Sequence, residues 1–179
     1  MSVVYSFQMN KTITMISIGR QSIMKKFAAR VLLTGLIAVA GFTSVAFGTT
    51  QQASAATQQS LSLVSIGKNY IGTPYLYGSA PGVTSTFDCS SYTQYVFGKM
   101  GIWLPRVSSA QAYMGEKVDR AYLSVGDLVF FNTSGKGISH VGIYAGNGHM
   151  LHASSQGVKL TNMNTSYWNK AYVWARRVL

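Results

Sequence analysis

Phe87-Asp88-Cys89-Ser90-Ser91-Tyr92 holds the only cysteine of this 179-residue chain and places it where a helix should begin. Asp88 and Ser90 are good helix-capping residues, and apolar side chains follow them at helical spacing. Cys89 therefore falls in the first turn of the helix. Free backbone N–H groups and the positive end of the helix dipole favour a thiolate there, and the thiolate is the nucleophilic form of cysteine. The alternative interpretation is a buried and inert thiol.

The first third of the chain has the composition of an export signal rather than of a folded domain. A basic start at Met24-Lys25-Lys26 leads into an apolar run from Phe27 through Phe47, and Ala53-Ser54-Ala55 is a small-residue cleavage pattern. We therefore predict a signal peptide over 24–55 and a secreted protein of the cell wall, and we treat residues 1–23 as an upstream extension. The alternative is a retained membrane anchor, because about 20 apolar residues can span a bilayer.

Cleavage near Ala55 leaves a basic segment that is long enough for one ordinary hydrophobic core. Ten Lys and Arg residues face four acidic residues in it, which gives a net charge of +6 against +11 for the whole chain. We expect such a domain to be drawn to anionic polymers such as a bacterial wall. The sequence has no clustered basic stripe, so nucleic acid is not the expected partner. One cysteine cannot form an internal disulfide, so the thiol either pairs with another chain or stays free, and we expect a monomer.

The order of the predicted elements indicates a compact α+β domain over 61–179, preceded by a polar linker over 56–60. Helices are predicted over Leu61–Tyr70, from Cys89 onward, and from Ser108 through Met114. The sequence pattern then changes to that of short strands separated by glycine, asparagine and serine turns. About five strands are predicted, at Asp127–Phe131, Ser139–Ala145, His149–Ser154, Val158–Thr161 and Ala171–Arg177.

Two of the three histidines flank a strong hairpin signal, Ala145-Gly146-Asn147-Gly148. A turn centred on Gly146 makes His140 and His152 direct cross-strand partners, with both side chains on the same face of the sheet. Gly142 then lies between them, which leaves space in front of the two imidazoles. A register shift of one residue would separate the two rings, because it moves one of them to the opposite face.

A thiol, a neighbouring histidine and a third polar group that orients the histidine form the arrangement for covalent acyl transfer. In this reading Cys89 is the nucleophile, His140 takes the thiol proton and later gives it to the leaving amine, and His152 holds the other ring nitrogen of His140. One cysteine and two histidines can also bind zinc with a water as the fourth ligand. We expect no metal, because the usual close ligand pairs are missing and Cys89 lies 51 residues before His140.

Six short motifs cover nearly all of the predicted domain, namely Gly72–Tyr75, Phe87–Ser91, Leu104–Arg106, Gly126–Phe131, Ser139–Tyr144 and His152–Ser154. In this order they resemble the successive motifs of the NlpC-type cell-wall cysteine peptidases. The resemblance implies a papain-like fold, with N-terminal helices packed on a mostly antiparallel sheet, and a reaction that needs no cofactor. It also implies hydrolysis of peptide bonds in peptidoglycan stem peptides, in many members between D-γ-glutamate and a diamino acid.

The resemblance also assigns individual positions. It places the nucleophile at Cys89, the base at His140 and the orienting residue at His152. Tyr75 falls on the active-site tyrosine of the family, and Asp88 and Ser90 fall on positions that line the substrate pocket, where an acidic side chain can hold the free amine of a stem peptide. The backbone N–H of Cys89 is a natural oxyanion donor at the helix start. The loop from Tyr75 to Cys89 is longer than the family pattern, which affects the substrate subsite rather than the chemistry.

Two other functions remain open from the sequence. An amidase or acyltransferase that acts on another wall or lipid substrate would use the same thiol and imidazoles. A non-catalytic wall-binding protein would not need Cys89, His140 and His152 together. The expectation is therefore a secreted cysteine endopeptidase that acts on peptidoglycan.

Overall fold

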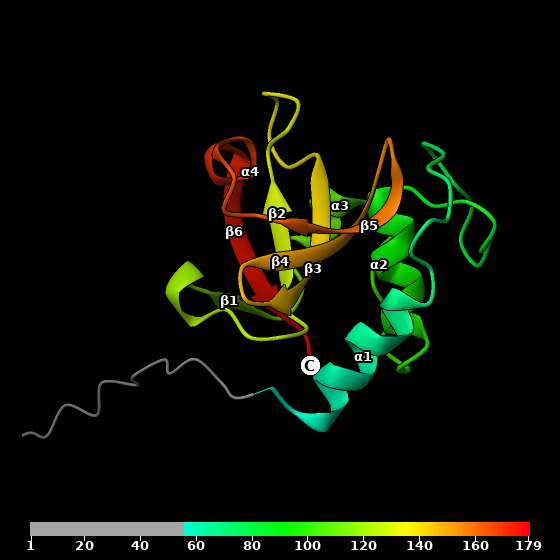
Figure 1. The fold of residues 1–179 in the computed structure, drawn as a ribbon, viewed down its shortest axis with the longest axis horizontal. Helices are drawn as coiled ribbons and strands as arrows, with labels where there is room; N and C mark the ends of the chain where they lie inside the picture. Colours follow the sequence, from blue (N-terminus) through cyan, green and yellow to red (C-terminus); the bar gives the residue numbers. More distant parts are fainter. Residues whose placement is uncertain (1–55) are drawn as a thin grey trace, which may run out of the picture. The chain divides into compact units, whose positions relative to one another are not determined.

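The computed structural model describes residues 56–179, which form four α-helices, one short 3-10 helix and a six-stranded antiparallel sheet (Figure 1). This architecture confirms the predicted α+β class, with helices packed on an antiparallel sheet. The predicted upstream extension and signal peptide, and the alternative of an anchor, fall on residues 1–55, outside the described residues. Within residues 56–179, no helix has the length and apolar character needed to cross a membrane.

The strands lie in the order β1-β6-β2-β3-β4-β5 across the sheet. The helices are α1 (Gln58–Lys68), α2 (Cys89–Gly98), α3 (Ser108–Gln111), the 3-10 helix η1 (Arg120–Tyr122) and α4 (Ser166–Ala171). The strands are β1 (Glu116–Val118), β2 (Leu128–Phe131), β3 (His140–Gly146), β4 (His149–Ser154), β5 (Gly157–Asn162) and β6 (Tyr172–Arg177). The five predicted strands appear as β2 through β6. The sequence analysis does not predict β1, because three residues are too few to display an alternating pattern; this strand pairs with β6 at the edge of the sheet.

The first helix begins earlier than predicted. Thr57 is the N-cap of α1, and its hydroxyl accepts a hydrogen bond from the backbone N–H of Ser60 at 3.1 Å. The Ser60 hydroxyl accepts from the backbone N–H of Thr57 at 3.0 Å, which completes a capping box. The predicted linker over 56–60 is therefore wrong for its last three residues, which are helical. The helix ends at Lys68 rather than Tyr70, and α3 is likewise shorter than predicted.

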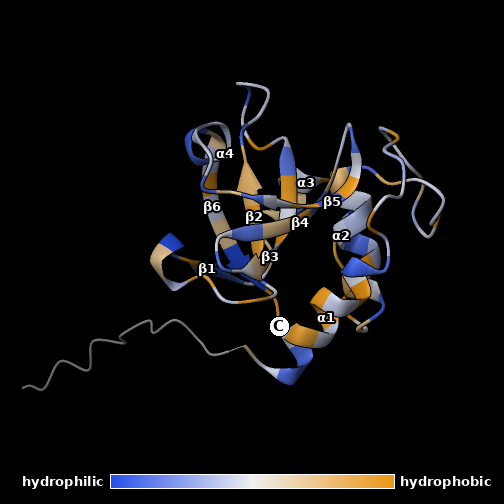
Figure 2. Cartoon of the chain, in the orientation of Figure 1, coloured by the Kyte–Doolittle hydropathy of each residue, from blue (hydrophilic) through white to orange (hydrophobic). Residues whose placement is uncertain are grey.

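The two faces of the sheet carry two separate hydrophobic clusters. On one face, α1 and α2 pack on β3 and β4, and the larger cluster includes Tyr92 of α2, Val141 of β3 and Leu151 of β4. Figure 2 shows hydrophobic residues on α1 and along β2. On the other face, Phe131 of β2 packs against Trp168 of α4, with ring centroids 4.9 Å apart. Alternation along β3 therefore directs Val141 toward the helices and His140 toward the opposite face, where Trp168 lies.

The pairing of β3 with β4 differs from the prediction by two residues. Ile143 lies opposite Leu151 and Tyr144 opposite Met150, so His140 and His152 are diagonal neighbours rather than direct partners. The turn is centred on Asn147 and Gly148, whose φ angles of 50° and 71° suit a two-residue hairpin turn, and a bulge precedes it. Because a shift by two residues preserves the side-chain face, both imidazoles remain on the same side of the sheet.

Candidate active site

Cys89 is the first residue of α2, as predicted, and its thiol faces the start of β3. The Asp88 carboxylate caps the helix by accepting a hydrogen bond from the backbone N–H of Ser91 at 2.8 Å. The Ser91 hydroxyl in turn accepts from the backbone N–H of Asp88 at 2.9 Å. The Cys89 side chain is 8% exposed and lines a hollow of about 750 Å³. Its thiol lies 4.0 Å from the carbonyl oxygen of Ser139, to which it donates.

The surroundings of the Cys89 thiol favour its protonated form. Burial raises the pKa of Cys89, and the neighbouring Asp88 carboxylate raises it further. The backbone N–H groups of Val141 and Ser90 lower the pKa of Cys89, but they do not offset the burial. The helix start by itself predicts a lowered pKa for Cys89, whereas burial of the thiol shifts the pKa in the opposite direction.

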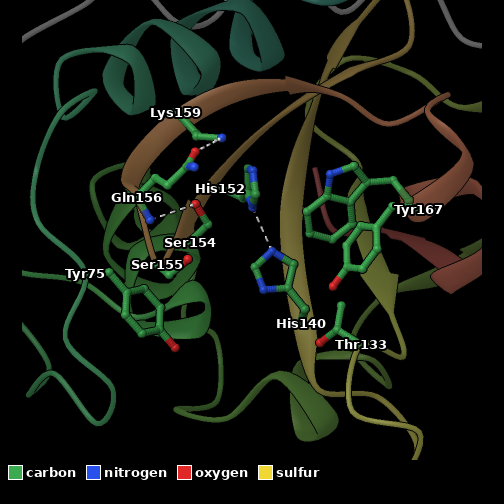
Figure 3. Close-up of a pocket in the computed structure, with 10 residues that line it drawn as sticks. Tyr75, Thr133, His140, His152, Ser154, Ser155, Gln156, Lys159 and Tyr167 are labelled. Atoms are coloured by element: carbon green, nitrogen blue, oxygen red, sulfur yellow. Dashed lines mark hydrogen bonds between the residues drawn. The ribbon is translucent and has the colours of Figure 1, made fainter.

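The two imidazoles form a series of hydrogen bonds that ends on a hydroxyl, and Figure 3 shows the bond between the two rings. His140 Nε2 lies 2.8 Å from His152 Nδ1. His152 Nε2 lies 2.8 Å from the hydroxyl oxygen of Thr161 on β5. The sequence analysis does not identify Thr161, although its place in the predicted fifth strand is correct. This series of hydrogen bonds involves only the Nε2 atom of His140, and the Nδ1 atom of that ring takes no part in it.

Both rings are neutral at physiological pH because they are buried. His140 is 9% exposed and His152 is fully buried, and Trp168 packs on both, with ring centroids within 5.2 Å. Burial lowers the pKa of His140 to about 4. Burial lowers the pKa of His152 to about 3, and the charges of His140 and Lys159 act in the same direction. The pair therefore starts as two uncharged rings beside an uncharged thiol.

The thiol and the imidazoles meet at the N-terminal end of β3 without sharing a hydrogen bond. The acceptor for the thiol is the carbonyl of Ser139, the residue that directly precedes His140. Tyr75 connects the two groups, because it lines both the hollow that holds Cys89 and the hollow that holds the imidazoles. Burial raises the pKa of Tyr75, with further contributions from Cys89 and Asp88, so its hydroxyl is protonated and can donate.

Asp88 is the centre of a charged network that the sequence analysis identifies only in part. Arg106 donates from both terminal nitrogens to the Asp88 carboxylate and also reaches the carbonyl of Ser79 at 2.6 Å. The Ser90 hydroxyl donates to Asp88 at 3.2 Å. Burial alone would raise the pKa of Asp88, but the bonds from Arg106 and the Ser91 backbone reverse this and lower it. Arg106 belongs to one of the six sequence motifs, which is the signal that could have identified it.

A second hollow, of about 360 Å³, lies in front of the imidazoles (Figure 3). Its lining includes Tyr75, His140, His152, Lys159 and Trp168. Figure 3 shows Lys159 and Gln156 on one side of the imidazoles and Tyr167 on the other. The site therefore consists of two hollows, one beside the thiol and one beside the bases, with Tyr75 in both.

The geometry does not suit the zinc alternative. His140 Nε2 and His152 Nδ1 point at each other, and His152 Nε2 points at Thr161, so three of the four ring nitrogens already have partners. Within the part of the chain that the structure describes, no three His, Cys, Asp or Glu side chains are grouped closely enough to hold a metal ion.

A thiol at a helix start, next to a buried pair of histidines on an antiparallel sheet, defines the class of papain-like cysteine hydrolases. The model of the NlpC/P60 family matches residues 72–177. The chain belongs to the NlpC/P60 family. This confirms the predicted family and, at the level of the family, the predicted cysteine-type peptidase class.

Several similar proteins carry names of cell-wall enzymes. The chain is 45% identical over 116 residues to the probable endopeptidase p60 of Listeria monocytogenes. The aligned segment covers 65% of this chain and 23% of that protein. The chain is 44% identical over 115 residues to the probable peptidoglycan endopeptidase LytE of Bacillus subtilis, covering 64% and 33%. It is 42% identical over 118 residues to the gamma-DL-glutamyl hydrolase of Bacillus subtilis, covering 64% and 28%. The chain thus spans a third or less of each of these relatives.

Solved structures share the fold. An NlpC/P60 family protein from Bacillus cereus superposes with a TM-score of 0.62 at 36% identity, over 67% of this chain and 40% of that one. The NlpC/p60 domain of the peptidoglycan hydrolase SagA gives a TM-score of 0.57 at 30% identity, over 66% of this chain and 97% of that one.

Proposed function

We propose that the protein is a secreted cysteine endopeptidase that hydrolyses peptidoglycan stem peptides at the bond between D-γ-glutamate and a diamino acid. The observation that carries this proposal is that the Cys89 thiol and the hydrogen-bonded imidazole pair line two hollows that share Tyr75. Family membership supports the reaction class. The name of the Bacillus subtilis gamma-DL-glutamyl hydrolase supports a γ-glutamyl bond.

The hydrogen-bond chain gives His140 the tautomer of a base. When His152 donates from Nε2 to Thr161, its Nδ1 accepts from the Nε2–H of His140. The Nδ1 lone pair of His140 is then free to take the thiol proton. The contact between the thiol and this nitrogen forms when substrate displaces the thiol from the Ser139 carbonyl, since catalytic hydrogen bonds often tighten only in the complex.

The reaction proceeds through a thioester. The Cys89 sulfur attacks the carbonyl carbon while His140 Nδ1 accepts the thiol proton, and the carbonyl electrons move to the oxygen. The backbone N–H of Cys89 at the helix start donates to that oxyanion. The C–N bond breaks as His140 returns the proton to the leaving amine. Water, deprotonated by His140, then attacks the thioester and releases the acid and the free thiol.

The hollow beside the thiol receives the acyl half of the substrate. Its polar lining includes Asp88, Ser90 and Arg106, and the Asp88 carboxylate carries a negative charge because Arg106 and the Ser91 backbone lower its pKa. That charge attracts the free amine of a stem peptide, while the fixed Arg106 holds the carboxylate in place. The same hollow accommodates the longer loop between Tyr75 and Cys89, which contributes Tyr77 and Gly78 to the lining.

Export and wall targeting complete the proposal. The basic start, the apolar run and the small-residue pattern before Gln58 support a secretory signal, and the names of the relatives support a location at the cell wall. The net charge of +6 after Ala55 supports attraction to anionic wall polymers.

Digestion of defined muropeptides followed by mass spectrometry tests the function. The expected result is two products whose masses add up to the substrate plus one water, with the cut after D-γ-glutamate. Products that carry a transferred acyl group, or cleavage only of a side-chain amide, would instead support an acyltransferase or an amidase. Binding to walls without any product would support a non-catalytic protein.

A further inference from the structure

The hollow in front of the imidazoles receives the leaving half of the substrate, if the proposed function holds. His140 gives its proton to the leaving amine, so the amino acid that carries this amine must lie beside His140. The acyl half occupies the other hollow with Cys89, Asp88 and Ser90. The residues in front of His140 therefore select the third residue of the stem peptide.

Lys159 is the charged group of this hollow. It is half-buried, and its ammonium donates to the amide oxygen of Gln156, as Figure 3 shows. An ammonium has three N–H donors, so two remain for a ligand. None of the ten lining residues is Asp or Glu, and the two histidines are neutral because burial lowers the pKa of each. The hollow thus offers one positive charge and no negative one.

This charge selects between the two chemical types of diamino acid. A diaminopimelate carries a carboxylate at the far end of its side chain, whereas a lysine carries only an ammonium there. The carboxylate can accept a charge-assisted hydrogen bond from Lys159. The lysine ammonium meets a like charge with no carboxylate to offset it. We propose that Lys159 binds the side-chain carboxylate of the third stem residue and makes the enzyme prefer diaminopimelate over lysine.

The spacing of the strands favours the distant carboxylate over the one next to the scissile bond. His140, His152 and Lys159 stand on three consecutive strands, and Lys159 is the cross-strand partner of His152. Neighbouring strands lie about 4.8 Å apart, so β5 lies roughly 10 Å from β3. The α-carboxyl group is bonded to the carbon that carries the leaving amine and so stays close to His140. The far end of the side chain is the part that reaches β5.

The substitution Lys159→Gln tests this inference when it is measured as a ratio of two substrates. The substrates are two stem peptides that differ only in the third residue, diaminopimelate or lysine. We expect the wild type to prefer the diaminopimelate peptide by about tenfold or more in kcat/KM. Lys159→Gln should reduce that preference to about twofold, and Lys159→Glu should favour the lysine peptide.

The ratio is needed because Lys159 also acts on the catalytic pair. Its charge lowers the pKa of His152, so its removal can change the rate for every substrate alike. A uniform change leaves the ratio untouched, whereas loss of recognition changes it. Lys68→Gln, at an exposed position in the last turn of α1, removes the same charge far from the cleft and should leave both rates unchanged.

A third substrate identifies the carboxylate. Amidation of the side-chain carboxyl of diaminopimelate should cost the wild type as much as the change to lysine, and amidation of the α-carboxyl should not. Equal wild-type rates on the diaminopimelate and lysine peptides, or a parallel loss on both in Lys159→Gln, would overturn the inference and leave the proposed function intact. Failure of the wild type to cleave either peptide would overturn the proposed function itself.

Discussion

At the scale of single residues, we propose that Thr161 sets the tautomers of the two histidines. Its hydroxyl oxygen lies 2.8 Å from His152 Nε2, at the end of the chain that begins at His140. When this hydroxyl accepts, the proton of His152 lies on Nε2, and the Nδ1 of His152 can accept from the Nε2–H of His140. The hydroxyl thereby acts on the base through another ring, as a positioning residue.

Thr161→Val removes this acceptor with little change in volume. We expect kcat to fall about tenfold with KM unchanged, because the base would populate the wrong tautomer while the substrate pockets stay intact. Thr161→Ser retains the hydroxyl and should retain most of the activity. Steady-state kinetics on a defined muropeptide checks this pair of variants, and a Thr161→Val enzyme with wild-type kcat would show that the hydroxyl has no such role.

At the scale of elements, local signals predict where each segment lies better than which partners it meets. The capping pattern at Asp88 is local, and so the start of α2 at Cys89 is predicted correctly. The two histidines lie on the same face of the sheet, as predicted, although the predicted strand pairing is wrong by two residues. The reason is that side-chain faces repeat every two residues. Arg106 and Thr161 are not predicted as site residues, because hydrophobic and capping patterns do not report which polar side chains from neighbouring segments will meet. The direction of the Cys89 pKa shift depends on burial by the whole fold.

The contact between α1 and α2 depends on a glycine. A methyl group at Gly67 would lie 2.7 Å from the Tyr92 hydroxyl oxygen and 3.2 Å from Leu151. The same Tyr92 hydroxyl donates to the carbonyl of Gly67 at 3.0 Å, so the two helices cannot separate without losing this bond. Close approach of the helices thus requires glycine at this position.

Gly67→Ala should lower the free energy of unfolding by about 1–3 kcal/mol, the range for overpacked cores. The matched control is Gly98→Ala in α2, where an added methyl group meets nothing within 4 Å. That control should be neutral or stabilise by up to about 1 kcal/mol, because alanine is the better helix former. Thermal or urea unfolding of both variants checks the pair, and equal effects would mean that the helix contact is not tight.

At the scale of the whole molecule, the two buried histidines connect folding to pH. Burial lowers the pKa of His140 to about 4 and that of His152 to about 3, whereas an exposed histidine in the unfolded chain titrates near 6.5. Between these values the unfolded chain binds protons that the folded protein does not bind. The free energy of unfolding must therefore fall as the pH falls below about 6.5.

The loss from His140 alone should reach about 3 kcal/mol at pH 4, since each pKa unit corresponds to about 1.4 kcal/mol. We expect the melting temperature to be flat above pH 7 and to decrease steadily from pH 6.5 to pH 4. His152→Gln should show a shallower decrease, because it removes one of the two buried imidazoles. Calorimetry over this pH range checks the slope, and a melting temperature that is constant down to pH 4 would contradict the neutral pair.

The net charge of the described domain should determine how strongly it binds to walls. Residues after Ala55 carry +6 in total, and each of their ten Lys and Arg residues is exposed or half-buried, so their attraction to anionic polymers is screened by salt. We expect the fraction bound to purified walls to decrease several-fold between about 0.05 M and 0.5 M NaCl. A pull-down assay with the inactive enzyme measures this, and binding that does not depend on salt would point to recognition by uncharged contacts.

The proposed reaction depends on the Cys89 thiol, and soluble fragments released from purified cell walls measure the contribution of that thiol. The comparison is between the wild type and Cys89→Ala, after equal melting curves have shown that both are folded. We predict that mass spectrometry detects stem-peptide fragments cut after D-γ-glutamate with the wild type, and that release by the variant is lower by at least about a thousandfold. The same fragments released at a comparable rate by Cys89→Ala would contradict attack by this sulfur.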